Sequence, residues 1–577
     1  MSGNTSVSSP AGDSADDLGP PRRRSFLKFG GATLLAGGAV ASTAAARQPA
    51  AAKAAAQEAR PVREAARSAA AAPPRPQVPP DLQSLVPIPA GRPQAAVDEL
   101  DQIVKNAMTK TGVPGVAVAV VHGGSVLYAR GFGIRNVNTK ASVDASTVFQ
   151  LASVSKSLSS TVVAGAVGKK IIGWADPVTR HLPGFALADP YVTSHVTYAD
   201  LFSHVSGLPD HAGDLLEDLG YSQAYILNRL RLEPLGPFRA QYEYTNFGLT
   251  TAAVAAAGAA GHAWADLADE ILFGPAAMRS ASFRYADFAK QANRTAMHVR
   301  VGKRWVQKYT RDADPEAPAG GASASVLDLA NWMILQLASG KWKGKQVIGD
   351  AALSQAHLPH ALSGLPSTPA SRSGFYGYGT NVSYDYAGRL RLSHSGGFAQ
   401  GAATAFTLLP SVNLGIVTLT NGMPIGIPEA INNYFMDYVE AGSVQDDWLT
   451  LYGQAFASLY VNHSELAGKK PPKNPVPAKP ASFYTGTYAN SYYGPIRIVE
   501  EKKTLHLLIG PRPENYVLQH WSGNLFAFYP TGENAVGITA ATFTPGAGGK
   551  QAKSVTLEYY NSNPDGTPNG LGRFIRS

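Results

Sequence analysis

The chain has 577 residues, of which 45% are hydrophobic and 16% are charged, and its formal net charge is +9. This composition is typical of a globular protein, and the length predicts two or more domains. The chain contains no cysteine, which excludes disulfides, thiolate metal ligands and a lipid-modified N-terminal cysteine. Residues 1–92 hold eleven Lys/Arg and six Asp/Glu, so much of the positive charge lies before the expected folded part and does not indicate a nucleic-acid partner.

The N-terminal segment resembles a bacterial twin-arginine export signal. Arg23-Arg24-Ser25-Phe26-Leu27-Lys28 precedes a short Gly/Ala-rich apolar run, and Ala44-Ala45-Ala46 offers a cleavage site. The alternative is a basic patch before a membrane anchor. It is disfavoured because spanning a bilayer takes about 20 apolar residues, and this apolar run is short and rich in glycine. We therefore expect residues 1–46 to be a signal for the twin-arginine export machinery. The mature protein is then periplasmic or extracellular, with no stable transmembrane segment.

Residues 47–93 form an Ala/Pro/Arg-rich spacer with too little hydrophobic variety to build a core. Residues 94–442 are expected to form the main domain. Apolar residues at helical spacing predict a helix over Gln94–Thr111. Val116–Val121 and Ser125–Phe132 are predicted strands, joined by a turn at His122-Gly123-Gly124.

The middle of this domain is predicted to be mostly helix and loop. Ser153–Val167 and the Ala-rich Leu249–Ala260 are expected helices, and Ser325-Val326-Leu327-Asp328 is a capping-box start for a helix to about Leu337. Four β-rich runs and a helix then follow: Tyr376–Tyr386, Arg389–Ser395, Ala402–Leu409, Asn413–Asn421 and Pro428–Val439. Strands at both ends of a segment with helices between them predict an α+β fold, in which one antiparallel sheet is flanked by helices and accompanied by a helical subdomain.

The pattern of the sequence changes after this domain. Residues 443–480 are predicted to be a helix over Trp448–Tyr460 followed by a Pro-rich linker around Pro471–Pro477. Residues 481–577 contain short alternating strands separated by turn residues, which predicts a small antiparallel β-barrel domain.

The first chemical motif is Ser153-Val154-Ser155-Lys156. Ser153 follows a β-like run and opens a helix, where the helix dipole favours an alkoxide. Lys156 lies one turn further on the same face and can take the serine proton when it is neutral, which burial promotes. By itself the pattern more often indicates a helix N-cap with a solvated lysine.

The second motif is Tyr244-Thr245-Asn246, in front of the Ala-rich helix. Residues two apart in an extended segment point the same way, so the Tyr244 phenol would lie beside the Asn246 amide. The phenol can relay a proton, and the amide can hold the lysine or a substrate carbonyl. The alternative is a core tyrosine and an asparagine that caps the helix.

The third motif is His394-Ser395-Gly396-Gly397. Leu390, Leu392 and His394 share one face of a predicted strand, and the two glycines would let a substrate backbone approach closely. An acyl chain would lie along this edge as an added strand, with the amides of Ser153 and Gly397 as an oxyanion hole. The alternative is a surface histidine in a turn.

Taken together, the three motifs make the chain resemble the serine β-lactamase and penicillin-binding-protein-like hydrolases. The relevant branch includes class C β-lactamases, DD-peptidases, D-aminopeptidases and esterases. Leu201-Phe-Ser-His-Val-Ser-Gly-Leu-Pro209 and Tyr376-Gly-Tyr-Gly379 match as well. The similarity covers about residues 95–440, and the C-terminal region resembles the lipocalin-like barrel appended to some of these peptidases.

The resemblance implies a serine hydrolase without metal or cofactor. Ser153 would form the acyl-enzyme, Lys156 and Tyr244 would manage its proton, and Asn246, His394, Ser395, Gly396 and Gly397 would bind substrate. Whether Lys156 or Tyr244 is the base stays open.

One departure concerns substrate choice. Position 394 is lysine in most β-lactamases, and a histidine there is mostly neutral at pH 7. We therefore expect weak β-lactam turnover and favour D-amino-acid peptides or related small amides and esters.

Alternatives remain in and beyond this family: a β-lactamase or carboxylesterase of the same fold, or a non-catalytic module that binds cell-wall peptide. Two other hydrolase classes are disfavoured because the chain has neither Gly-x-Ser-x-Gly nor His-Glu-x-x-His. Whether the C-terminal barrel caps the cleft, and so restricts substrates to short ones, is a further open point.

Overall fold

The structure is a computed structural model that describes residues 86–577 except 367 and 370. The predicted export signal and most of the predicted spacer lie outside the described residues. None of the helices in the described part of the chain is both long and apolar enough to cross a membrane.

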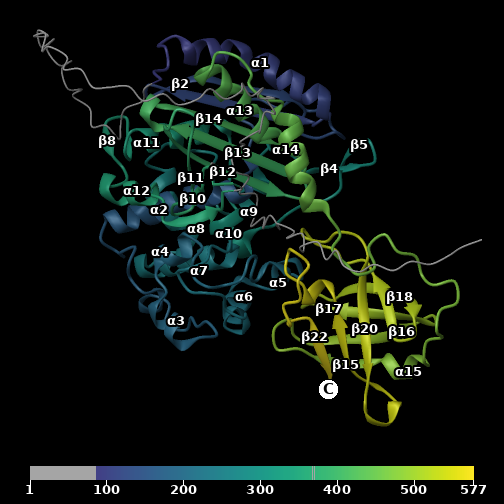
Figure 1. Ribbon diagram of the computed structural model, residues 1–577. Helices are drawn as coiled ribbons and strands as arrows, with labels where there is room; N and C mark the ends of the chain where they lie inside the picture. The colour runs from purple at the N-terminus through teal and green to yellow at the C-terminus, as the bar shows by residue number, and fades with distance from the viewer. Residues whose placement is uncertain (1–85, 367, 370) are drawn as a thin grey trace, which may run out of the picture.

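The main domain is built on one antiparallel sheet of eight strands in the order β2-β1-β14-β13-β12-β11-β10-β9 (Figure 1). The predicted hairpin is confirmed, because β1 (Gly115–His122) pairs with β2 (Ser125–Gly133). β1 also pairs with β14 (Leu414–Thr420), which itself pairs with β13 (Ala402–Leu409). Strands from both ends of the domain therefore lie side by side, as an α+β fold requires.

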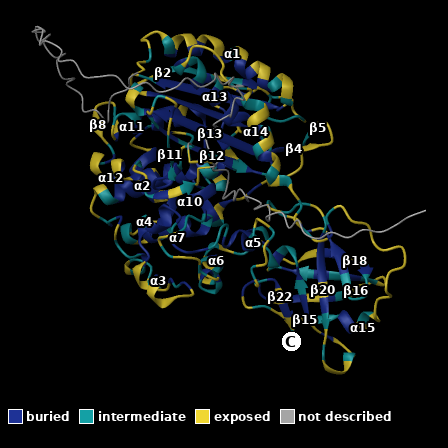
Figure 2. Cartoon of the chain, viewed as in Figure 1, coloured by how far each residue is buried: buried dark blue, intermediate teal, exposed yellow. Residues whose placement is uncertain are grey.

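Alternate side chains of β1 face two different helical layers. Val116, Val118 and Val120 are buried in one cluster with residues of α1 (Arg92–Thr111) and α13 (Ile427–Glu440). Ala117, Ala119 and Val121 face the other layer, which includes α11 (Val326–Leu337). Side chains alternate across a strand, so an apolar run without polar gaps is what a sheet covered on both faces demands. Figure 2 shows β13, in the middle of this sheet, as buried.

The helical region surrounds α2 (Ser155–Gly168), which is buried from Ser155 to Ala166. The Ala-rich α7 (Asn246–Ala260), α10 (Ala317–Gly320) and α12 (Asp350–Ala356) pack against it. The predicted capping box of α11 is confirmed: Ser325 and Asp328 each accept from the other's backbone amide. The other helices of this domain are α3 (Pro190–His195), α4 (Tyr198–Phe202), α5 (Asp214–Asp218), α6 (Gln223–Arg229), α8 (Trp264–Ala268) and α9 (Tyr285–Lys290).

Three details differ from the sequence predictions. The single run Tyr376–Tyr386 is two strands, β10 (Gly374–Tyr376) and β11 (Asn381–Tyr384), because the chain turns at Gly379, where φ is 72°. The next strand, β12 (Leu390–Phe398), continues through both glycines after Ser395. Finally, α7 begins at Asn246, so Tyr244 and Asn246 do not share one extended segment.

The remaining strands of this domain are β9 (Ala361–Gly364) at the edge of the sheet and three short two-stranded ladders. These are β3 (Phe149–Gln150) with β6 (Ser323–Ala324), β4 (His298–Val301) with β5 (Arg304–Gln307), and β7 (Lys341–Trp342) with β8 (Lys345–Gln346).

The helix α14 (Trp448–Ala457) leads to the C-terminal domain, where eight strands form a closed antiparallel barrel. The barrel follows α15 (Ala481–Tyr484), and β15 pairs with β22 to close it. Aromatic side chains such as Tyr484, Phe526 and Phe543 fill its interior, with ring centroids 4.9–5.6 Å apart. The predicted fold, an α+β domain followed by a small β-barrel, is confirmed. The strands are β15 (Gly486–Ala489), β16 (Ile496–Glu501), β17 (Thr504–Ile509), β18 (Glu514–Ser522), β19 (Leu525–Phe528), β20 (Thr539–Pro545), β21 (Ala552–Leu557) and β22 (Arg573–Arg576).

The barrel lies against the helical region beside α5 and α6 (Figure 1). The Tyr221 hydroxyl donates to the Tyr493 carbonyl at 2.6 Å, and the Tyr225 hydroxyl donates to the Tyr492 carbonyl at 3.3 Å. The backbone amide of Glu533 donates to Asp218 Oδ1 at 2.9 Å. These contacts hold barrel residues against the helical region.

Candidate active site

Ser153 stands in a tight turn between β3 and α2. Leu151 leads into Ala152, which has a left-handed φ of 47°, and a 3-10 turn over Ala152–Val154 then continues as α2. Ser153 is half-buried and lines a cavity. Its amide lies at the start of the helical segment, where N–H groups have no intrahelical acceptor, so it can donate to a ligand.

Lys156 lies one turn after Ser153, with its Nζ 3.2 Å from Ser153 Oγ. The same Nζ donates to Asn246 Oδ1 at 2.6 Å and to the Ala319 carbonyl at 3.0 Å. Burial lowers the Lys156 pKa to about 8, against the opposing effect of nearby carboxylates, of which Glu316 is the strongest. The Asn246 and Ala319 carbonyl oxygens each accept one N–H of the Lys156 amine. When the amine is neutral, its lone pair therefore points toward Ser153.

Tyr244 packs beneath this pair, with its ring centroid 4.5 Å from Lys156 Nζ. Burial raises the pKa of its phenol well above the usual value, while the adjacent Ser153 hydroxyl acts in the opposite direction. The hydroxyl of Tyr244 has no hydrogen-bond partner of good geometry among the described residues. The phenol is therefore protonated at neutral pH, and Lys156 is the better placed base of the two.

Asn246 joins Lys156 to a second charged pair. Asn246 Nδ2 donates to Asp214 Oδ2 at 2.9 Å, and the same oxygen lies 2.6 Å from His211 Nδ1. Burial opposes the charge on His211, but the carboxylates of Asp210 and Asp214 outweigh it and raise the His211 pKa to about 9. These contacts fix which end of the Asn246 amide faces the lysine.

His394 is buried behind the site and hydrogen-bonded on both ring nitrogens. Its Nδ1 is 2.6 Å from the Ser395 carbonyl, which can only accept, so its Nε2 accepts from the Tyr376 hydroxyl at 2.8 Å. Burial, with a contribution from the charge of Lys156, lowers the His394 pKa to about 3. Its ring centroid is 6.4 Å from that of Tyr244. His394 is therefore a neutral group and is not among the described residues that line the cavity.

The other residues of the third motif are placed in different ways. The Ser395 side chain lies on the opposite face of β12, beside Glu429 of α13, so only its backbone faces the site. A Cβ on Gly396 would lie 2.3 Å from the Leu151 carbonyl and 2.9 Å from the Ser153 amide nitrogen. Only glycine allows β12 to touch the nucleophile turn this closely. Gly397 lines the cavity with Ser153, which suits the predicted pair of oxyanion-hole amides.

The structure thus brings Ser153, Lys156, Tyr244 and Asn246 together and places His394 behind them. His204, in the Leu201–Pro209 segment, also belongs to the site, although its place there does not follow from the sequence pattern. Its Nδ1 accepts from the Thr245 amide at 3.2 Å, and its ring lies 4.6 Å from the Tyr244 ring. Burial lowers its pKa well below the usual value, so His204 supports Tyr244 as a neutral ring.

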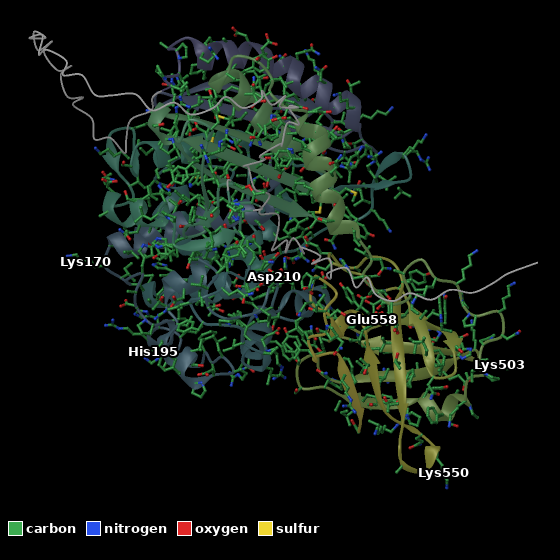
Figure 3. The ribbon with its side chains drawn as sticks, in the orientation of Figure 1. Lys170, His195, Asp210, Lys503, Lys550 and Glu558 are labelled. Atoms are coloured by element: carbon green, nitrogen blue, oxygen red, sulfur yellow. The ribbon has the colours of Figure 1, made fainter. Side chains whose placement is uncertain are left out.

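The cavity that Ser153 lines has a volume of about 740 Å³, and both domains contribute to its walls. Asp210 from the main domain and Glu558 from the barrel both line it, and Figure 3 labels them on either side of the junction. Arg311 lies in the wall and pairs with Glu217 of the main domain and with Glu533 of the barrel. The barrel therefore adds to the walls of the cavity that Ser153 lines.

Comparison with known proteins places these features in a family. A Beta-lactamase family model matches residues 100–440, and a domain of unknown function, DUF3471, matches residues 470–569. The chain belongs to the β-lactamase family. Members of this family are serine hydrolases, so the serine-hydrolase part of the sequence interpretation is confirmed.

The curated relatives of the chain are distant, and the share of its length that they cover varies. Unguisins hydrolase ungD of Aspergillus violaceofuscus is 23% identical and covers 70% of this chain and 76% of its own. Penicillin-binding protein 4* of Bacillus subtilis is 32% identical over a shorter region, 28% of this chain and 36% of its own. Among solved structures, the octameric penicillin-binding protein homologue from Pyrococcus abyssi aligns with a TM-score of 0.53 at 18% identity. It covers 83% of this chain and 100% of its own, which shows the shared fold.

Proposed function

We propose that the protein is an exported serine hydrolase that acts through a Ser153 acyl-enzyme on D-amino-acid peptides or related small amides and esters. The observation that carries this proposal is the 3.2 Å approach of Lys156 Nζ to Ser153 Oγ, with the amine oriented by Asn246 and the Ala319 carbonyl. A nucleophile, its base and a group that orients the base are the parts that acyl transfer needs. The N-terminal twin-arginine-like signal supports export, by way of the twin-arginine machinery, to a periplasmic or extracellular location.

In the proposed mechanism, neutral Lys156 takes the proton of Ser153 as Oγ attacks the substrate carbonyl carbon. The negative charge that develops on the carbonyl oxygen is met by the amides of Ser153 and Gly397. The proton then passes from Lys156 to the leaving nitrogen or oxygen as the carbonyl–leaving-group bond breaks, and the Tyr244 phenol lies beside this path. Water attacks the resulting ester, gives its proton to Lys156, and Ser153 regains the proton when the acid is released.

The choice of substrate is supported by what the third motif offers. His394 is neutral and hydrogen-bonded to Tyr376, so it supplies no positive charge to bind a substrate carboxylate. We therefore expect weak turnover of β-lactams. The barrel forms part of the cavity wall, which favours short substrates. One relative is named as an unguisins hydrolase, which supports a hydrolytic role rather than a purely binding one.

The direct test is covalent labelling of Ser153 in the full chain by an uncharged fluorophosphonate, read as the intact mass. We expect one adduct per chain, and none in Ser153→Ala with an unchanged melting temperature. Incubation with D-peptide esters should then show a transient acyl adduct. Equal labelling of Ser153→Ala, or no labelling of the unaltered chain, would contradict a Ser153 acyl-enzyme and favour a binding module.

The pH dependence of the reaction is expected to follow Lys156. Only the neutral amine can accept a proton, and its pKa is lowered to about 8 by burial. On an uncharged ester, kcat/KM should therefore rise tenfold per pH unit below about pH 8 and level off above it. Since the phenol of Tyr244 has a pKa well above the usual value, it adds no ionisation in this range. A profile that is flat between about pH 6 and about pH 9 would contradict Lys156 as the base.

A further inference from the structure

One wall of the cavity holds far more negative than positive groups. Arg311 Nη2 lies 2.6 Å from Glu217 Oε2 and 3.1 Å from Glu316 Oε1. Its Nε lies 3.3 Å from Glu533 Oε2, and its Nη1 lies 3.6 Å from Asp218 Oδ1. All five side chains are largely buried, with exposed fractions of 4–16%. One guanidinium therefore pairs with four carboxyl groups. Because these groups are buried, the unbalanced negative charge is unfavourable for the folded state.

Among the carboxyl oxygens of this wall that have no hydrogen-bond partner in the described part of the chain are Asp214 Oδ1, Glu217 Oε1 and Glu316 Oε2. The residues that carry them are only 7%, 7% and 3% exposed. All three line the same cavity as Ser153. A buried oxygen without a donor is unfavourable, so the wall is complete only when a ligand supplies donors and positive charge.

We propose that this acidic wall, defined by Asp214, Glu217 and Glu316, binds a primary ammonium group of the substrate. An ammonium carries three donors and no acceptor, and it adds positive charge to that of Arg311, which four carboxyl groups share, and of His211, which pairs with Asp214. The substrate class is then a small peptide, amide or ester with an ammonium near the scissile carbonyl. This inference rests on the proposed function, since it names which substrates reach Ser153.

The position of the wall supports a role next to the reacting carbonyl. Its carboxylates lie close enough to Lys156 to raise the pKa of that amine, against the larger effect of burial. Burial also raises the Glu217 pKa well above its usual value and the Glu533 pKa to about 8, so protons neutralise part of the wall at pH 7. A bound ammonium would displace those protons. Among the described residues that line the cavity, Arg311 is the only Lys or Arg, and its carboxylate partners occupy it.

The ammonium has two possible sources, the free α-amino group or a lysine-like side chain, and competition against labelling of Ser153 separates them. The full chain is treated with an uncharged fluorophosphonate at pH 7 in the presence of D-alanine amide, Nα-acetyl-D-lysine amide or uncharged N-acetyl-D-alanine amide. We expect at least one ammonium compound to protect Ser153 at about tenfold lower concentration than the uncharged amide, which corresponds to about 1.4 kcal/mol.

Each outcome of this competition is decisive. Stronger protection by D-alanine amide assigns the wall to an α-ammonium, and stronger protection by the lysine derivative assigns it to a side-chain ammonium. If neither ammonium compound protects better than N-acetyl-D-alanine amide, the inference is wrong, although Ser153 is still a reactive nucleophile. If Ser153 is not labelled at all, the proposed function fails instead.

Substitutions in the wall connect the preference to these residues. Glu217→Gln and Glu316→Gln each remove a carboxyl group that would pair with a bound ammonium and keep the side-chain shape, so the preference for ammonium should fall by about tenfold in each. Two variants are used because each removes a charged partner of Arg311, and a melting curve identifies a folded one. Glu501→Gln, on the exposed surface of the barrel, is the matched control and should keep the preference. An unchanged preference in a folded wall variant would also overturn the inference.

Discussion

Replacement of Lys156 by methionine is expected to lower kcat/KM on an uncharged ester by about 10⁴-fold, the scale of a lost general base in a serine hydrolase. The change removes the amine that lies 3.2 Å from Ser153 Oγ and preserves most of the side-chain volume. The change also removes a buried ammonium. Because burial disfavours this charge and already lowers the Lys156 pKa, the fold should tolerate its loss. Initial rates together with the rate of fluorophosphonate labelling provide the measurement.

Two comparison variants make this result specific. Lys169→Met lies at the C-terminal end of the same helix, where the side chain is 48% exposed, and should keep full activity. Tyr244→Phe should lose much less than Lys156→Met, about 10–100-fold, because its protonated phenol assists the proton transfer without starting it. If Lys156→Met keeps most of its activity while Tyr244→Phe loses nearly all, the base is Tyr244.

Local spacing explains why part of this site could be predicted from sequence. Ser153 and Lys156 are one helical turn apart, so any helix beginning there brings them together. The two faces of β1 and the Ser325–Asp328 capping box follow from periodicity and from backbone amides that need acceptors. These relations act within a few residues and leave a readable pattern.

The acidic wall could not be predicted in this way. Glu217 and Glu316 are 99 residues apart, and their neighbour Glu533 lies a further 217 residues along the chain, in another domain. Nothing in their neighbourhoods distinguishes them from solvated surface acids, which most glutamates are. The bond between His394 and Tyr376 was missed for a related reason: sequence shows that a histidine stands where a cation is usual, but not what it contacts.

Replacement of Arg311 by methionine is expected to destabilise the protein by about 3–5 kcal/mol, the cost of removing one partner from a buried ionic cluster. Its guanidinium is the shared partner of Glu217, Glu316, Asp218 and Glu533, and each of these is largely buried. Since Glu533 belongs to the barrel, the loss also weakens the junction between the domains. Urea unfolding followed by circular dichroism measures the change, with limited proteolysis of the 443–480 segment as a second readout.

The loss of stability in Arg311→Met should depend on pH in a defined direction. Burial raises the pKa values of Glu217 and Glu316, and that of Glu533 to about 8, while Arg311 acts to lower all three. Without Arg311 these carboxyls hold protons more tightly in the folded state than in the unfolded chain. Such groups contribute stability that is present below the unfolded pKa and is lost as pH rises through the folded pKa. Arg311→Met should therefore be least destabilised near pH 5 and most destabilised at about pH 8 or above.

An exposed ion pair provides the control for this effect. Lys169 Nζ lies 2.7 Å from Glu270 Oε1, and both side chains are about half exposed, so solvent screens them. Lys169→Met should cost less than about 1 kcal/mol at either pH. If Arg311→Met were as stable as Lys169→Met and equally insensitive to pH, the four carboxyls around Arg311 would be solvated rather than buried. The acidic wall would then have no need of a substrate cation, because water would already satisfy its oxygens.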